Sequence, residues 1–311
     1  MDIVTHGVTG VLVSRAIPSG HKASIMAAGL IGALAPDLDE AARLWDPMAV
    51  ISVHRTVTHS FIGGSIVALV VAGLVWGLSR ENFLWLFGVA YLGLISHMGL
   101  DLLTSFGTAF LWPLTDRRFA LSLYYVFDPI FTTLTLVFLI ASFWSKRGRI
   151  SLARASLIGV VLYVLVTSAH QSMAFSRWQG FMESQGIEPI RSVVIPLFPG
   201  PLRWLGLAET GKAFYQKSFW VYGPAPGSTR VFSKTDGSIL QVGQLREVQL
   251  FLKFASFPMT LVRTEGSLRI IEYRDLAFVD HPLGVLGGPL SLRIWVDESD
   301  SVRKVELGHL F

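Results

Sequence analysis

Long uncharged stretches alternate with short polar ones over the first half of the chain, and this pattern predicts helices that cross a membrane. Residues 61–79, 82–100, 129–145 and 155–176 contain no Asp, Glu, Lys or Arg, and each approaches the ~20 apolar residues that a helix needs to span hydrocarbon. Residues 3–14 and 23–36 are apolar but shorter, and the turn-forming residues 17–20 join them. These two stretches predict a hairpin of short or tilted helices. We therefore expect about six helices.

The second half of the chain has a different period. Residues 267–273, 291–296 and 302–307 alternate apolar and polar side chains, which is typical of half-buried strands. Residues 235–238 (Thr-Asp-Gly-Ser) and 297–300 (Asp-Glu-Ser-Asp) are expected to form hairpin turns between such strands. A small antiparallel sheet is the predicted result.

Between these halves we expect an interfacial segment followed by a linker. Phe175, Trp178, Phe181 and Met182 are spaced so that they could lie among lipid headgroups, and residues 196–201 are rich in Pro and Gly. The predicted fold class is a mainly α polytopic membrane protein with a small C-terminal antiparallel β domain. The expected domains are 1–172, a transmembrane helical domain with a metal site; 173–216, the interfacial segment and linker; and 217–311, a β-rich soluble domain.

Composition supports a membrane location and excludes several kinds of site. Only 15% of residues are charged, against about 25% in a soluble domain, and 20 of the 48 charged residues (26 basic plus 22 acidic) lie in residues 1–172. The chain has no cysteine, which excludes disulfides, thiolate nucleophiles and Cys-based zinc sites. The net charge of +4 comes with no basic stripe interleaved with aromatic residues, so no nucleic acid partner is predicted.

The distribution of basic residues predicts the orientation. With the N-terminus outside, the inner loops hold seven Lys and Arg residues and the outer loops hold four, as the positive-inside rule requires. The C-terminal domain is then extracytoplasmic. A signal peptide over residues 1–20 is disfavoured, because the first residues are not basic and no small-residue cleavage site follows.

Histidines and aspartates gather in four short clusters within the first 101 residues, namely His6; Asp37 and Asp39; His54 and His59; and His97 and Asp101. His97 and Asp101 are four residues apart on an apolar helix, so both side chains point to one face. Such a pair inside a span is costly unless it meets a partner, an ion or water. It could be a helix-packing ion pair, but in the N-out topology all four clusters reach the outer membrane surface, which favours a metal site.

Imidazoles and carboxylates without thiolates suit Zn²⁺ best here, with Mn²⁺ or Fe²⁺ as alternatives, and one or two ions are expected. The predicted ligands are His6, Asp37, Asp39, His59, His97 and Asp101, with His6 on a second ion. Asp39 could instead be a general base or orient a ligating histidine, and His54 is predicted as catalytic, an outer partner of a ligand or a substrate contact. Arg55, Arg117 and Arg118 suit a substrate phosphate or lipid headgroups.

The same residues resemble a known family. The motifs are Thr5-His6, Pro36-Asp-Leu-Asp39, His54-Arg55 with Thr58-His59-Ser60, and the block 91–114 that contains His97, Asp101, Thr104, Gly107 and Leu111-Trp-Pro113. Over about the first 115 residues the chain resembles the bacterial membrane-bound metal-dependent hydrolases typified by the LexA-regulated inner-membrane protein YdjM. This resemblance implies a multi-pass protein of a bacterial inner membrane with hydrolase activity. His97-x3-Asp101 is also similar to part of the ligand pattern of zinc-dependent phospholipases C, whose downstream His and Glu ligands have no counterpart here.

The sequence thus predicts a membrane-bound hydrolase whose metal-activated water attacks an ester, most simply a phosphoester of a lipid or lipid-linked substrate. Membrane lipids are the expected partners. One alternative is a metal-binding transporter or assembly factor without hydrolytic activity, although a transporter should have polar residues that continue toward the inner face. Another makes the membrane half an anchor for a C-terminal binding module.

Overall fold

The chain forms a helical unit and a sheet unit, which are described separately. The structure is a computed structural model that describes residues 1–19, 22–145, 147–223, 228–233, 242–278, 290–299 and 301–308. The helical unit comprises Met1–Ala42, Val53–His170 and Pro199–Pro201, and the sheet unit comprises Arg43–Ser52, Gln171–Phe198 and Leu202–Phe311.

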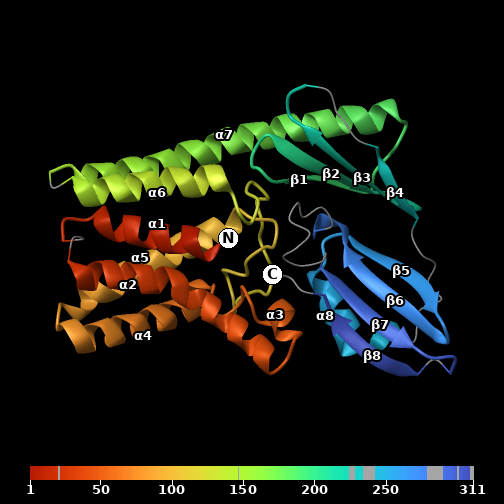
Figure 1. Ribbon diagram of the computed structural model, residues 1–311, viewed down its shortest axis with the longest axis horizontal. Coiled ribbons are helices and arrows are strands. Elements are labelled where there is room, and N and C mark those ends of the chain that lie inside the picture. Colours follow the sequence, from red (N-terminus) through yellow and green to blue (C-terminus); the bar gives the residue numbers. More distant parts are fainter. Residues whose placement is uncertain are drawn as a thin grey trace. The chain divides into compact units, whose positions relative to one another are not determined.

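Helices occupy the apolar stretches of the helical unit (Figure 1). They are α1 (Ile3–Arg15), α2 (Ala23–Leu34), the 3-10 helix η1 (Ala35–Leu44), α4 (Phe61–Ser79), α5 (Phe83–Leu102), α6 (Pro129–Trp144) and α7 (Arg149–Ser184), the last of which continues into the sheet unit. Several begin at a side chain that accepts a backbone N–H of the first turn: Asp2 for α1, Ser60 for α4, Asn82 for α5 and Asp128 for α6. The cap residues therefore decide where the predicted stretches become helical.

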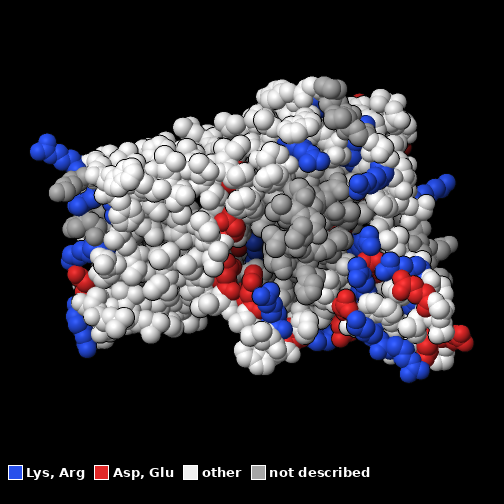
Figure 2. Space-filling view, in the orientation of Figure 1, with Lys and Arg blue, Asp and Glu red and all other residues white. Residues whose placement is uncertain are grey.

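Three of the described helices, α4, α5 and α7, are long and apolar enough to cross a membrane. The apolar α6 has 16 residues, while α1 and α2 have 13 and 12. Figure 2 shows a broad surface of the helical unit without Lys, Arg, Asp or Glu between its two ends. One end carries Lys22, Arg80, Arg149 and Arg154 and is called the basic end; the opposite end is called the site end. The mostly helical membrane domain is thus confirmed, and six crossings stay a prediction.

Close contact between α2 and α5 depends on glycine. A Cβ atom built on Gly32 would lie 2.2 Å from the carbonyl oxygen of Ala90, and one on Gly10 of α1 would lie 2.5 Å from the carbonyl oxygen of Gly29. Real Cβ atoms essentially never come within 3.0 Å of a backbone atom. The missing side chains let α2 pack directly on α5 and α1, which brings the end of α2 beside the end of α5 at the site end.

We expect Gly32→Ala to destabilise the helical unit by about 1–3 kcal/mol, because the added methyl group forces α2 away from α5. Gly88→Ala in α5 is the matched control, since nothing lies within 4 Å of a Cβ built there. Alanine is the better helix former, so the control should be neutral or slightly stabilising. Thermal unfolding of both variants in detergent measures the difference, and equal midpoints would contradict this account of the packing.

The sheet unit contains two four-stranded antiparallel sheets, each in sequential order (Figure 1). The strands are β1 (Arg191–Pro196), β2 (Arg203–Glu209), β3 (Ala213–Trp220) and β4 (Arg230–Ser233) in one sheet, and β5 (Pro258–Glu265), β6 (Leu268–Asp275), β7 (Ser291–Val296) and β8 (Val302–Leu307) in the other. The short elements are α3 (Ala49–Ser52), η2 (Val242–Gln244), α8 (Arg246–Phe254) and η3 (Leu276–Phe278). Met48 and Ile51 pack with Val248 and Phe251 in a core that also includes the inner side chains of β7.

The antiparallel C-terminal β domain is confirmed, but it starts earlier than the sequence pattern indicated. The first sheet begins at Arg191 rather than after residue 217, and the Pro/Gly-rich residues 196–201 connect β1 to β2. Of the turn predicted at residues 297–300, residues 297–299 follow β7, and residue 300 lies outside the described residues. The backbone N–H groups of Ser299 and Ser301 both donate to Asp297 Oδ1 at 2.9 Å. The turn predicted at residues 235–238 lies outside the described residues.

The expected interfacial segment is a continuation of α7. Trp178 and Met182 are 1% and 2% exposed, and both pack in an apolar cluster with Trp204 and Phe219 of the first sheet. Their apolar surface is therefore buried in protein rather than among headgroups, which corrects the sequence interpretation. The amphipathic pattern was real, but a sheet covers it.

Candidate metal centre

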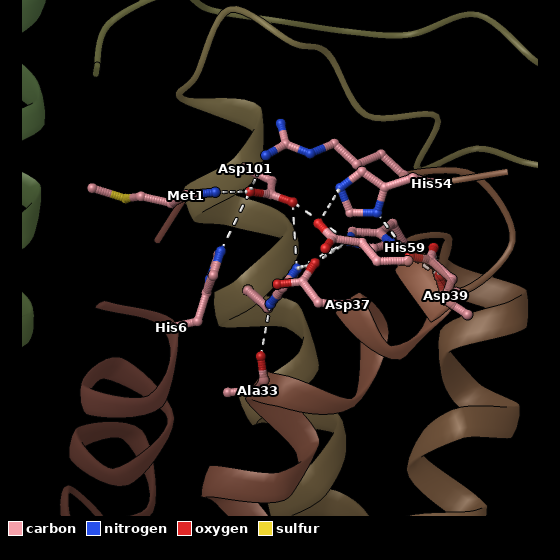
Figure 3. Close-up of polar contacts among 12 residues, drawn as sticks. Met1, His6, Ala33, Asp37, Asp39, His54, His59 and Asp101 are labelled. Atoms are coloured by element: carbon pink, nitrogen blue, oxygen red, sulfur yellow. Dashed lines mark hydrogen bonds and ion pairs between the residues drawn. The ribbon is translucent and has the colours of Figure 1, made fainter. Parts of the chain in front are cut away.

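All four clusters of histidine and aspartate come together at the site end of the helical unit (Figure 3). His6 lies in the first turns of α1, and His97 and Asp101 lie in the last turns of α5. Asp37 and Asp39 belong to η1, which begins where α2 ends, while His54 and His59 lie in the segment before α4. His6 and Asp101, which are 95 positions apart in the sequence, therefore lie side by side at the ends of α1 and α5.

Four donor atoms face one another at the centre of this group. His59 Nε2 lies 3.0 Å from His97 Nε2 and 3.2 Å from Asp37 Oδ1. Asp101 Oδ2 lies 3.3 Å from His97 Nε2 and 3.5 Å from His59 Nε2, and His97 Nε2 lies 3.3 Å from Asp37 Oδ1. Four ligands about 2.0–2.1 Å from a tetrahedral ion would be about 3.3–3.4 Å apart. The spacing of these four atoms therefore fits one divalent metal ion.

Hydrogen bonds on the outer side of each imidazole turn Nε2 inward. His97 Nδ1 lies 2.7 Å from the carbonyl oxygen of Ala33, which can only accept, so Nδ1 is the donor. Thr58 Oγ1 donates to Asp39 Oδ2 at 2.5 Å and accepts from His59 Nδ1 at 2.9 Å. In neutral rings, this network assigns the lone pairs to both Nε2 atoms. Such outer partners are what metal-ligating histidines usually have.

The centre is largely buried and rich in negative charge. His59, His97 and Asp101 are fully buried, the side chain of Asp37 is 24% exposed, and Asp101 Oδ2 makes no hydrogen bond within the described part of the chain. Two nitrogen lone pairs and two carboxylate oxygens repel one another at these distances unless a cation lies among them. A proton on one imidazole offsets part of this repulsion, and a metal ion is the cation that can contact all four atoms.

The acidic residues of η1 lie outside the spans, and their pKa values follow from the same contacts. Burial alone would raise the pKa of Asp37, but contacts with His59 and His97, whose Nε2 atoms can donate when the rings are protonated, hold it well below its usual range. Burial likewise opposes ionisation of Asp39, and hydrogen bonds from His54 and His59 hold its pKa below the usual range. Both aspartates are therefore carboxylates at neutral pH.

Asp39 lies behind the four donor atoms rather than among them. Its Oδ1 is 2.7 Å from His54 Nδ1, and its Oδ2 is 3.4 Å from His59 Nδ1. The other ring nitrogen of His54, Nε2, is 3.6 Å from Glu40 Oε1. The sequence left three roles open for Asp39: metal ligand, general base, or a residue that orients a ligating histidine. This geometry supports orientation of histidines.

His6 is close to the centre but outside the set of four. Its ring stacks on His97 with centroids 3.7 Å apart, and its Nε2 is 3.4 Å from Asp101 Oδ1. Neither ring nitrogen of this fully buried residue has a hydrogen-bond partner among the described residues. The backbone amine of Met1 also contacts Asp101 Oδ1.

The three arginines predicted to bind substrate have different surroundings. Arg55 is 4% exposed, and its Nη2 lies 2.9 Å from Asp101 Oδ1. Arg118 is partly buried and donates from Nη2 to the carbonyl oxygen of His54 at 2.9 Å; burial and the charge of Arg55 lower its pKa to about 10, so it stays cationic. Arg117 is exposed and lies over the ring of Phe119. Arg118 is thus the cation near the centre that remains a substrate-binding prediction.

The sequence did not predict the carbonyl of Ala33 as the partner of His97, or Thr58 as the partner of His59. A backbone acceptor leaves no mark in a sequence. Thr58 is adjacent to His59, and that adjacency is the one signal that could have indicated its contact with the imidazole. Glu40 was also missed, although it directly follows Asp39.

The fold and the clustered ligands define an apolar helical membrane protein with a candidate divalent-metal centre at one end. The family model described as "YdjM inner membrane protein" matches residues 1–174, so the chain belongs to that family of inner membrane proteins. A relative, the uncharacterized protein YfhP of Bacillus subtilis (strain 168), is 26% identical over 194 residues. That match covers 62% of this chain and 58% of the relative. No solved structure matches the chain.

We expect His97→Ala and Asp101→Ala to remove most bound metal from purified protein, because each deletes one of the four inward donor atoms. His170→Ala is the control, since this α7 histidine lies outside the groups of candidate ligands. Elemental analysis after dialysis against zinc-buffered solution measures the ion content. Unchanged metal in both site variants, with the helical content preserved by circular dichroism, would exclude this ligand set.

Proposed function

We propose that this protein is a membrane-bound metal-dependent hydrolase that cleaves an ester, most simply a phosphoester of a lipid or lipid-linked molecule. The observation that carries the proposal is the set of four inward-facing donor atoms on His59, His97, Asp37 and Asp101, spaced as a single divalent ion requires. A zinc, manganese or iron ion bound there would lower the pKa of a coordinated water and so supply hydroxide near neutral pH.

Two features support hydrolysis over a purely structural ion. Asp37 is the one donor of the four with an exposed side chain, so water and substrate can approach from its side. His54 is held through Nδ1 by Asp39, which leaves Nε2 to accept or give a proton at the edge of the centre. His54 is 8% exposed, and its ring lies 5.2 Å from that of His59, centroid to centroid.

The competing function is an ion-binding transporter or assembly factor, and one observation favours it. Four side-chain donors fill a tetrahedral shell, as in structural zinc sites, whereas catalytic zinc usually has three protein ligands and one open position. A catalytic site here requires a fifth position around zinc, release of Asp37, or a six-coordinate ion such as Mn²⁺. The partial exposure of Asp37 suits such an opening.

A lipid-like substrate is supported by the position of the centre. It lies at the end of α5, a helix apolar enough to cross a membrane, so the acyl chains of a substrate could remain in the bilayer while its headgroup reaches the ion. The cationic Arg118 lies beside His54 and suits a phosphate group. These two observations favour a phosphoester over a carboxylic ester.

The decisive experiment offers purified, zinc-loaded protein a panel of phospholipids and polyprenyl phosphates, with release of product as the measurement. We expect cleavage of at least one phosphoester and its loss in His97→Ala. His54→Ala should keep its metal but lose about 10²–10⁴-fold in rate, the usual contribution of a general acid or base. Bound metal without cleavage of any substrate would favour the ion-binding alternative.

We further propose that the site end faces the extracytoplasmic side, because the cations gather at the basic end. The absence of cysteine makes this directly testable by labelling. We expect Leu114→Cys, at an 82% exposed position of the site end, to react with a membrane-impermeant maleimide in intact cells. Arg80→Cys at the basic end should react only after permeabilisation. The reverse pattern would place the centre in the cytoplasm.

A further inference from the structure

The two carboxylate oxygens of Asp101 face different surroundings. Oδ2 points to the imidazoles of His59 and His97, where the metal ion is proposed. Oδ1 points away from that position, toward Nη2 of Arg55 at 2.9 Å, Nε2 of His6 at 3.4 Å and the backbone amine of Met1. Because the carboxylate is fully buried, the groups in contact with Oδ1 determine how many positive charges the centre holds besides the proposed ion.

The guanidinium of Arg55 is fixed at the C-terminal end of α5 by hydrogen bonds. Its Nη1 donates to Thr104 Oγ1 at 2.8 Å, and the same hydroxyl donates to the carbonyl oxygen of Asp101 at 2.8 Å. The backbone of Arg55 has a φ of 61°, a left-handed conformation that a residue with a side chain rarely adopts. Its carbonyl accepts from the N–H of Ala109 at 2.9 Å, which helps to hold this turn. The unfavourable backbone conformation of Arg55 thus accompanies the burial of its guanidinium against Asp101.

We infer that Arg55 occupies the position of a second metal ion, so that the centre holds one divalent ion and one guanidinium, joined by Asp101. Two-metal hydrolases place their ions about 3.5–4 Å apart, commonly around shared ligands. A second ion on Oδ1 would meet the Arg55 guanidinium at close range in a buried site, where repulsion between like charges is strong. His6, the further imidazole beside Oδ1, has no hydrogen-bond partner in the described chain and stays outside the set of four. A second group of possible ligands, Asp39, His54 and His59, is already joined by the contact of His54 Nδ1 with Asp39 Oδ1 at 2.7 Å.

This inference rests on the proposed metal centre and sharpens it. Arg55 is then a positioning residue: it holds Oδ1 and leaves Oδ2 directed at the ion. The expectation of one or two ions narrows to one, and His6 ceases to be a ligand in the native protein.

The test is the number of zinc ions bound per chain, measured by elemental analysis on protein in detergent after equilibration with buffered zinc. We expect one ion in the native protein, in His6→Ala and in Arg55→Lys, which keeps a cation. Arg55→Ala should take up a second ion beside Oδ1 in the place of the guanidinium, where His6 and the Met1 amine remain as neighbours. The double variant Arg55→Ala with His6→Ala should return to one. Arg80→Ala is the matched control, because Arg80 also has a left-handed φ, of 55°, but is exposed at the basic end.

Two ions in the native protein that fall to one in His6→Ala would overturn the inference while leaving the metal centre intact. A single ion of unchanged affinity in Arg55→Ala would also overturn it. If Arg55→Ala does not fold, the native protein and His6→Ala still decide between one ion and two. A native protein without bound zinc would instead contradict the metal-dependent hydrolase itself.

Discussion

The carboxylate of Asp101 is buried without any exposed surface, and the free energy of removing that charge from water is the constraint on which the site end depends. A lone buried carboxylate costs several kcal/mol, so its oxygens must meet cations or hydrogen-bond donors. One oxygen meets Arg55, and the other faces the two imidazoles at the proposed ion position. The left-handed turn at Arg55 brings its guanidinium to the first oxygen, and Thr104 Oγ1 accepts a second hydrogen bond from the same guanidinium. The inward Nε2 atoms place the proposed ion beside the other oxygen.

Helix packing places the remaining ligands. Gly32 lets α2 lie directly on α5, and one residue further along α2 the carbonyl of Ala33 accepts the Nδ1 proton of His97. The next turn of the chain is η1, which carries Asp37 to the same point. Apolar packing in the middle of the helices and polar geometry at their ends are therefore coupled, because a shift of α2 would move both an acceptor and a ligand.

The sequence predicted the parts of this structure that depend on local pattern. The uncharged stretches became helices at nearly the predicted residues, and His97 and Asp101 share a helix face because they are four residues apart. The prediction that residues such as Trp178 lie among lipid headgroups was wrong. An amphipathic helix has the same sequence pattern whether lipid or a sheet covers its apolar face, and here the first sheet covers it. The direction of Arg55 could not be predicted either, since a guanidinium suits a substrate phosphate and a buried aspartate equally well. Those outcomes depend on contacts between distant residues.

The point at which α2 ends has an electrostatic consequence. Helix C-termini carry partial negative charge from carbonyls that no longer have partners within the helix. The Ala33 carbonyl lies in this last turn, so the hydrogen bond it accepts joins the negative end of the α2 dipole to the imidazole of His97. α5 also ends here and directs its own negative pole toward the same place. Because α1 and α4 begin at the same end with their positive poles, the effect of the backbone is local: the Ala33 carbonyl strengthens His97 as a ligand through the hydrogen bond that it accepts.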